Sequence, residues 1–230
     1  MPRRDLRPTM RAMAELKFFF GTMGSGKSTV ALQIRHNLTS RGLACVLITQ
    51  LDREEGKVSS RLGVSADALI LDHTVDLFRI LSVENCKGAG LHAVICDEAQ
   101  FYEPHQIDQL ARVVDELSVD VWAFGLLTSF QGELFPGTKR LLELADVRQE
   151  IQVEARCWCG ARATHNARLV NGRQVYDGEL KVVGDTSASE PSDLAPPVVS
   201  YDLLCRRHWL AEKDDPRQDA LFQDLPLVLD

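Results

Sequence analysis

The segment Gly21-Thr22-Met23-Gly24-Ser25-Gly26-Lys27-Ser28 carries the G-x-x-x-x-G-K-S pattern of a phosphate-binding loop. An apolar run at residues 16–20 precedes it, and a segment with alternating apolar residues and no glycine follows it. Glycines allow backbone N–H groups to turn inward around phosphate oxygens, and a helix N-terminus adds the positive end of its dipole. In this pattern Lys27 is expected to reach the β- and γ-phosphates, and the Ser28 hydroxyl to hold Mg²⁺. The alternative is a chance match in a glycine-rich turn, which the flanking strand and helix signals disfavour.

Length and composition limit the remaining possibilities. The 230 residues are 45% hydrophobic, which suits one substantial domain or one domain with a small appendage. The net charge of −7 gives no overall basic field for a nucleic-acid backbone, and no apolar run is long enough to span a membrane. Residues 1–15 carry arginines but lack the apolar core of a secretory signal. Six cysteines without such a signal favour reduced thiols or metal ligands, and hence a cytoplasmic protein.

Strand and helix signals alternate through the first two-thirds of the chain. Apolar runs predict strands at residues 16–20, 44–49, 92–96 and 121–126, and periodic segments predict helices at residues 27–40, 75–83 and 104–117. This alternation predicts an α/β fold in which a parallel P-loop (RecA-like) sheet is flanked by helices. After residue 150 the pattern changes to short β segments, with a hairpin turn at Asn171-Gly172.

Two acidic residues follow the third predicted strand. Asp97 and Glu98 stand at its carboxyl end, which is where folds with a phosphate-binding loop carry the carboxylates that serve Mg²⁺. Asp97 is therefore a candidate for the magnesium shell together with Ser28. Glu98 is a candidate for accepting a proton from an attacking hydroxyl. The alternative is an acidic pair that is merely solvated at a strand end.

Cys157-x-Cys159 and Cys205-x-x-His208 form a candidate zinc site. Zinc prefers four thiolate or imidazole ligands, supplied as two close pairs from separate turns. Because the ligand set is full, we expect a structural role for this metal rather than a catalytic one. The alternative is three reduced cysteines that happen to approach a histidine. The remaining cysteines are expected in the hydrophobic core: Cys45, Cys86 and Cys96.

Taken together, these motifs resemble the type II thymidine kinases. The resemblance extends from about Lys17 to Trp209. The phosphate-binding loop alone is generic, whereas a D-E-x-Q-F motif combined with the zinc ligands is specific. The matching elements, in the order of the family, are Gly21 to Ser28, the bacterial-type segment Gly56-Lys57-Val58-Ser59-Ser60-Arg61, Asp97-Glu98-Ala99-Gln100-Phe101, the segment from Gly125 to Phe135, and the Cys157, Cys159, Cys205 and His208 set.

The resemblance implies transfer of the γ-phosphoryl group of ATP to the 5′-hydroxyl of thymidine. It makes Glu98 the base, with Lys27 and either Arg53 or Arg61 supplying positive charge. It adds Asp97, Glu98, Ala99 and Gln100 to the residues of the loop that bind ATP. It also implies a homotetramer and feedback inhibition by thymidine triphosphate. The corresponding domains are an N-terminal extension (1–15), a nucleotide-binding kinase domain (16–150), a zinc-binding domain that carries a lasso loop (151–210), and a tail (211–230).

The resemblance also predicts an apolar and aromatic nucleoside pocket, because a nucleobase offers a flat face as well as polar edges. The lasso loop of the family holds the base, and here it would run from Val182 to Tyr201. Ordinary core packing is the alternative for each pocket candidate, and for Leu126 and Phe130 taken alone it is the favoured interpretation. Asn166 stands where relatives often place threonine or a small apolar residue near the thymine methyl group. The substrate-binding candidates are Phe101, Leu126, Phe130, Phe135, Val182, Val183, Gly184 and Tyr201.

Without the resemblance to the family, the residues are also compatible with a second function. A P-loop ATPase that couples hydrolysis to a nucleic-acid or protein partner would share the loop and could use zinc as an interaction module. That alternative predicts a basic face or arm, which the acidic composition disfavours. We therefore expect thymidine and ATP as partners, with no nucleic acid and no membrane. ATP turnover with and without thymidine discriminates between the two functions.

Overall fold

The computed structural model describes residues 13–50, 57–59, 65–151, 154–180 and 198–211. The chain divides into two compact units. The first consists of Met1–Phe20, Lys27–Gly125 and Pro136–Glu150, and the second of Gly21–Gly26, Leu126–Phe135 and Ile151–Asp230. The second unit thus includes two short segments from inside the predicted nucleotide-binding domain. The domain boundaries predicted near residues 15, 150 and 210 stay predictions.

The first unit is built on a six-stranded parallel sheet with the strand order β5-β2-β6-β7-β1-β8. Its central strands are short and almost fully apolar, as expected for parallel strands that are covered on both faces. Such strands are joined by crossovers, and all helices of this unit lie in those connections. The strands are β1 (Leu16–Phe20), β2 (Cys45–Thr49), β5 (Leu69–Ile70), β6 (Ala93–Asp97), β7 (Asp120–Gly125) and β8 (Val147–Glu150).

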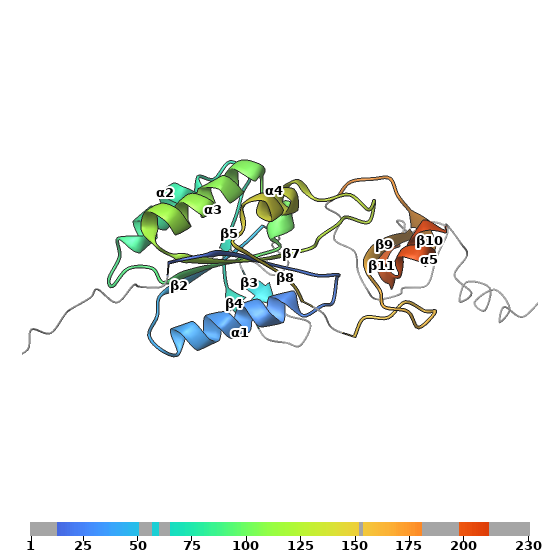
Figure 1. Cartoon of the computed structure of the whole chain (residues 1–230), viewed down its shortest axis with the longest axis horizontal. Coiled ribbons are helices and arrows are strands. Elements are labelled where there is room, and N and C mark those ends of the chain that lie inside the picture. The colour runs from blue at the N-terminus through green and yellow to red at the C-terminus, as the bar shows by residue number, and fades with distance from the viewer. Residues whose placement is uncertain (1–12, 51–56, 60–64, 152–153, 181–197, 212–230) are drawn as a thin grey trace, which may run out of the picture. The chain divides into compact units, whose positions relative to one another are not determined.

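Helices cover both faces of this sheet (Figure 1). The helix α1 (Lys27–Thr39) packs on one face against β2, β6 and β7. On the other face lie α2 (Leu77–Asn85), α3 (Pro104–Leu117) and α4 (Pro136–Leu144), and the core between them and the sheet includes fully buried Phe18, Ile107 and Leu110. A short antiparallel pair, β3 (Lys57–Ser59) and β4 (Ser65–Asp67), completes the described part of the unit.

Local sequence signals account for the start of α3. Pro104 occupies the first helical turn, where its missing N–H group is not needed. The Glu103 N–H donates to Gln106 Oε1 at 3.0 Å, so the side chain of Gln106 satisfies a backbone donor at the helix entrance. Apolar residues at helical spacing, from Ile107 to Val114, then face the sheet and are buried.

The second unit is built around a three-stranded antiparallel sheet with the strand order β10-β9-β11. The strands are β9 (His165–Val170), β10 (Arg173–Val175) and β11 (Val199–Leu204), followed by the short helix α5 (Arg206–Leu210). Asn171 and Gly172 link β9 to β10 with φ angles of 49° and 77°, the two positive values that a two-residue type I′ hairpin requires. One side of this sheet packs into a small core of Cys157, Ala167, Leu204 and Trp209.

Most element predictions are confirmed within one or two residues. The predicted strand 92–96 runs on to Asp97. The predicted helix 75–83 lies at Leu77–Asn85. It starts there because the Asp76 carboxylate accepts a hydrogen bond from the Arg79 N–H and caps the helix. The assignment of Cys86 to the core is wrong, since Cys86 is the exposed C-cap of α2. No helix of the described residues is both long and apolar enough to span a membrane.

Candidate active site and zinc centre

The carboxylates of the first unit lie at the carboxyl end of β6. Asp97 ends the strand, and Glu98 follows it in the left-handed region with φ 52° and ψ 35°. A non-glycine residue rarely adopts this conformation, and where it occurs it is held by the surrounding structure, often at functional sites. The sharp turn places Glu98 outside the end of the sheet, where α/β folds bind their ligands.

Asp97 is buried and has an unusual protonation equilibrium. Burial and the neighbouring Glu98 charge raise the pKa of Asp97 to about 6, although a hydrogen bond from the Ser28 hydroxyl, the Glu98 backbone N–H and the charge of Lys27 oppose the shift. Lys27 is also buried, and it forms the first turn of α1 together with Ser28. The structure therefore brings Lys27, Ser28 and Asp97 together, as the sequence predicts.

Glu98 is held by its neighbour in the short helix η1 (Ala99–Phe101). Gln100 Nε2 donates to Glu98 Oε2 at 2.7 Å, and the Gln100 side chain is buried whereas Glu98 is only partly covered. A Cβ atom on Gly125 would lie 2.8 Å from Gln100 Oε1, and one on Gly137 would lie 2.6 Å from the Ala99 carbonyl oxygen. These two glycines let β7 and α4 approach η1 closely enough to fix it.

The glycine-rich part of the loop, Gly21–Gly26, is described in the second unit. Gly24 and Gly26 have φ angles of 72° and 82°, and a Cβ atom on Gly21 would lie 2.7 Å from the Ile151 carbonyl oxygen. The Met23 N–H donates to Asn166 Oδ1 at 2.8 Å, so a buried side chain of β9 holds the backbone of the loop. This contact gives Asn166 a role that the sequence did not indicate.

An aromatic cluster lies beside β9 in the same unit. The Arg168 guanidinium stacks at 3.7 Å from the centre of the Phe130 ring and donates two hydrogen bonds, of 3.0 and 2.8 Å, to the Tyr201 hydroxyl. Phe130 is buried and Tyr201 is partly covered. The structure thus places two of the predicted substrate-binding residues on one arginine, which the sequence analysis missed.

The predicted zinc ligands converge in the second unit. One ligand atom from each of Cys157, Cys159, Cys205 and His208 lies within 4.8 Å of the others. Three of the separations are 3.2 Å (Cys157 Sγ to His208 Nδ1), 3.5 Å (Cys205 Sγ to the same nitrogen) and 3.9 Å (Cys159 Sγ to Cys205 Sγ). A tetrahedral zinc ion with usual bond lengths has S···S edges of about 3.8 Å and S···N edges of about 3.6 Å. The four residues therefore fit zinc.

The surroundings of these ligands support the same conclusion. Backbone N–H groups of His208 and Arg207 lower the pKa of Cys205, and together with the neighbouring cysteines they favour its thiolate form. Burial raises the pKa of Cys157, which is the ligand nearest the small core. The indole of Trp158 stacks 3.9 Å from the His208 ring and covers it on one side.

The remaining predicted site residues are distributed as follows. Ala99 and Gln100 are buried in η1, and Phe101 is partly exposed at its end. Leu126 is partly exposed and Phe135 is buried in the second unit. Arg53, Arg61, Val182, Val183 and Gly184 lie outside the described residues.

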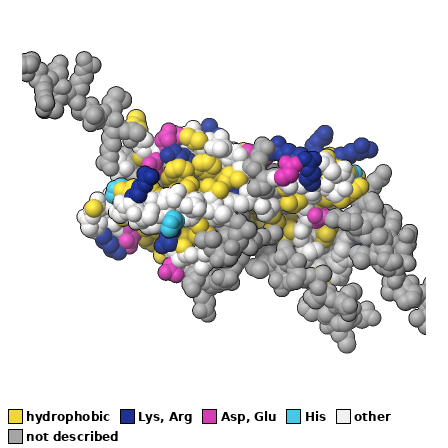
Figure 2. All heavy atoms as spheres, turned by 90° about the horizontal axis from the view of Figure 1, so that it is seen from below, with side chains coloured by type: hydrophobic (Ala, Val, Ile, Leu, Met, Phe, Trp, Pro, Cys, Tyr) yellow, Lys and Arg dark blue, Asp and Glu magenta, His cyan; other side chains and the backbone are white. Residues whose placement is uncertain are grey.

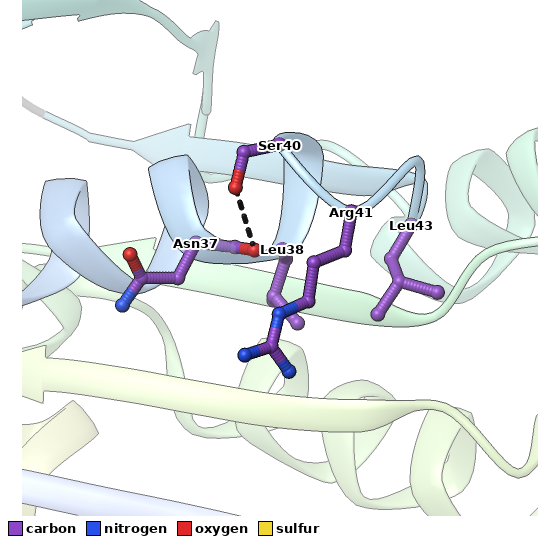
Figure 3. Close-up of a pocket in the computed structure, with 5 residues that line it drawn as sticks. All are labelled: Asn37, Leu38, Ser40, Arg41 and Leu43. Atoms are coloured by element: carbon purple, nitrogen blue, oxygen red, sulfur yellow. Dashed lines mark hydrogen bonds between the residues drawn. The ribbon is translucent and has the colours of Figure 1, made fainter.

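A surface depression of about 410 Å³ lies elsewhere in the first unit (Figure 3). It is lined by Asn37, Leu38, Ser40, Arg41 and Leu43 at the C-terminal end of α1. The 13 residues of this helix separate the depression from Lys27 by roughly 20 Å. The depression is therefore unrelated to the carboxylates of β6.

Comparisons with known proteins agree on one family. The family model "Thymidine kinase" matches residues 14–191. Thymidine kinases from Streptomyces coelicolor and Streptomyces avermitilis are each 54% identical over 197 residues, covering 85% of this chain and 88% of theirs. The thymidine kinase of Cutibacterium acnes is 46% identical over the same shares. A solved Pif1 helicase from Candida albicans aligns with a TM-score of 0.39 and 13% identity over 60% of this chain and 36% of its own, which is too distant to bear on fold or function.

Proposed function

Because this chain belongs to the thymidine kinase family, we propose that it transfers the γ-phosphoryl group of ATP to the 5′-hydroxyl of thymidine. The observation that carries the proposal is the pair Asp97 and Glu98 at the carboxyl end of β6, in one unit with Lys27 and Ser28. The 5′-oxygen attacks the γ-phosphorus, the bond from that phosphorus to the bridging oxygen breaks, and ADP leaves.

Glu98 serves as the general base. It stands at a sharp turn, is only partly covered, and receives a hydrogen bond from Gln100 on one carboxylate oxygen. Its carboxylate can therefore accept the proton of the 5′-hydroxyl as the oxygen attacks. Asp97 is not proposed as the base. It is buried, and its raised pKa reflects the cost of ionising it there.

The charges on ATP are met by the loop and by the start of α1. Backbone N–H groups of Gly21–Ser28 bind phosphate oxygens, Lys27 contributes a positive charge, and Asp97, Ala99 and Gln100 complete the ATP-binding set. The donor set of Ser28 and Asp97 fits Mg²⁺, because it brings a carboxylate and a hydroxyl oxygen into hydrogen-bond contact with each other. Mg²⁺ bound there supplies positive charge to the β- and γ-phosphate oxygens. Arg53 is the proposed second cation.

Apolar and aromatic residues are assigned to thymidine on the resemblance to the family. They are Phe101, Leu126, Phe130, Phe135, Val182, Val183, Gly184 and Tyr201. The zinc held by Cys157, Cys159, Cys205 and His208 is structural, since four protein ligands leave no open position. The resemblance to the family supports three further proposals: a homotetramer, feedback inhibition by thymidine triphosphate, and a place in the cytoplasm, where the six cysteines stay reduced.

The test is ADP release with ATP and Mg²⁺ against a panel of nucleosides. We expect release to require thymidine and to be much slower with deoxycytidine or deoxyguanosine. Release that depends on single-stranded DNA or RNA instead of a nucleoside would overturn the proposal in favour of a nucleic-acid-coupled ATPase. That alternative is not favoured by the family. Figure 2 shows both Lys and Arg side chains and Asp and Glu side chains exposed on one face of the described residues.

A further inference from the structure

Arg168 is a buried cation whose described partners are all neutral. Its side chain is 3% exposed. Its Nη1 group donates to the Glu179 carbonyl oxygen at 2.6 Å, and its Nε and Nη2 groups donate to the Tyr201 hydroxyl at 3.0 and 2.8 Å. A buried charge is costly unless hydrogen bonds satisfy it, so the fixed fork of the guanidinium must match these acceptors closely.

The register of the small sheet explains why Arg168 meets Tyr201. The two residues are directly opposite each other in the antiparallel pair of β9 and β11. Side chains on one strand alternate between the two faces, so Arg168 shares its face with Asn166, whereas Ala167 faces the core with Trp209. One face of this sheet thus supports the zinc centre, and the other holds Arg168 and Tyr201.

Two further segments of the same unit are fixed by this arginine. The guanidinium carbon of Arg168 lies over the Phe130 ring, 3.7 Å from its centre, a cation–π contact that is stronger when desolvated. Gly178 has φ 124°, a conformation that residues with a side chain rarely adopt, so glycine allows the backbone to take this path just before Glu179. A single side chain therefore joins the segments around residues 130, 179 and 201.

We propose that Arg168 is a positioning residue for the nucleoside: it holds the Phe130 ring and the Tyr201 hydroxyl in the orientation that binds the base. This inference rests on the proposed function, which assigns both aromatic residues to thymidine. Arg168 itself need not touch the substrate. Its fork fixes the Tyr201 hydroxyl with two donors and its flat face fixes Phe130, a combination that a lysine ammonium group cannot reproduce.

The experiment compares Arg168→Lys, Tyr201→Phe and the double variant with the wild type. Zinc content per chain, KM for thymidine, KM for ATP and the Kd for thymidine by equilibrium dialysis are measured for each. Arg168→Lys should raise KM and Kd for thymidine about tenfold, the effect of losing one well-placed interaction of about 1.4 kcal/mol, while KM for ATP changes less than twofold. Arg173→Lys, on the exposed side chain of a neighbouring strand, is the matched control and should change nothing.

The double variant shows whether Arg168 acts on thymidine binding through Tyr201. If Arg168 acts through the Tyr201 hydroxyl, Tyr201→Phe should also raise KM for thymidine, and the double variant should be no worse than Arg168→Lys alone. Multiplicative effects, or an unchanged Kd for thymidine in Arg168→Lys with full zinc, would overturn the inference. If Arg168→Lys loses zinc, Tyr201→Phe decides, because it removes one hydroxyl and keeps the ring. A wild type that fails to bind thymidine contradicts the proposed function instead, and the same comparison is then made with the nucleoside that does bind.

Discussion

Gln100 Nε2 donates a hydrogen bond to Glu98 Oε2 at 2.7 Å, and Gln100 is buried while Glu98 is only partly covered. The carboxylate of the proposed base is therefore hydrogen-bonded to a buried side chain of the protein. Effective general-base catalysis requires the carboxylate to be held near its productive geometry, and this contact fixes one of its two oxygens.

Gln100→Leu should lower kcat for thymidine phosphorylation roughly tenfold or more, because the carboxylate loses its orienting donor. KM for thymidine should change little, because Gln100 is assigned to Glu98 and to the ATP-binding set and not to the nucleoside pocket. Gln149→Leu, at an exposed position of β8, is the control for the same change of side chain. Steady-state kinetics with both substrates varied would decide, and an unchanged kcat would contradict this role of Gln100.

Asp97→Asn should stabilise the protein without substrate at neutral pH while removing most of its activity. The pKa of Asp97 is raised from 3.8 to about 6 in the fold, so ionising it costs up to about 3 kcal/mol of folding free energy above pH 6. That cost disappears as the pH falls from 6 towards 4, since the folded protein then takes up a proton. Urea unfolding should therefore show a gain of about 1–3 kcal/mol at pH 7.5 that shrinks at pH 5. A gain that does not depend on pH would contradict the assignment.

Gly137→Ala tests the packing that fixes η1. Helix propensity alone favours alanine over glycine by at most about 1 kcal/mol at this second residue of α4. A Cβ atom, however, would lie 2.6 Å from two backbone oxygens, those of Ala99 and Tyr102, and overpacking of this kind costs about 1–3 kcal/mol. We expect a net loss in unfolding free energy together with a lower kcat, because η1 carries Gln100. Lys139→Ala, exposed on the same helix, should be neutral or slightly stabilising.

Cys205→Ser should reduce zinc content below one ion per chain and loosen the small unit. Zinc affinity at such a site contributes directly to the folding of the segment that carries the ligands. Because that segment also holds Tyr201 and Arg168, KM for thymidine should rise more than KM for ATP. Metal analysis of protein purified without chelators provides the check. Wild-type protein without zinc, or a variant with full zinc and unchanged kinetics, would contradict the structural role.

Those parts of the fold that depend on local pattern could be predicted from the sequence. The apolar strands, the helix from Pro104 to Leu117 and the Asn171-Gly172 hairpin follow from periodicity and turn chemistry. The cluster of Cys157, Cys159, Cys205 and His208 could be predicted because close pairs of cysteine and histidine are typical of zinc sites. Lys27 and Ser28 were found because they end a contiguous motif.

The contacts that depend on tertiary packing could not be predicted. Asn166 bonds to the Met23 backbone 143 residues away, and Arg168 meets Phe130 only once β9 is folded. Nothing in the local sequence indicates these two contacts, since both residues stand in an ordinary strand with alternating faces. Cys86 was misassigned because an apolar helix pattern does not indicate where the helix ends.

The most direct measurement for the central claim is single-turnover phosphoryl transfer by Glu98→Gln, measured beside ATP binding. The amide keeps the size of the side chain and its hydrogen-bonding capacity but cannot accept the 5′-hydroxyl proton. Transfer to thymidine should fall about 10²–10⁴-fold, while Kd for ATP stays within a few-fold of the wild type. A variant that binds ATP normally and transfers the phosphoryl group at more than half the wild-type rate would show that Glu98 is not the base.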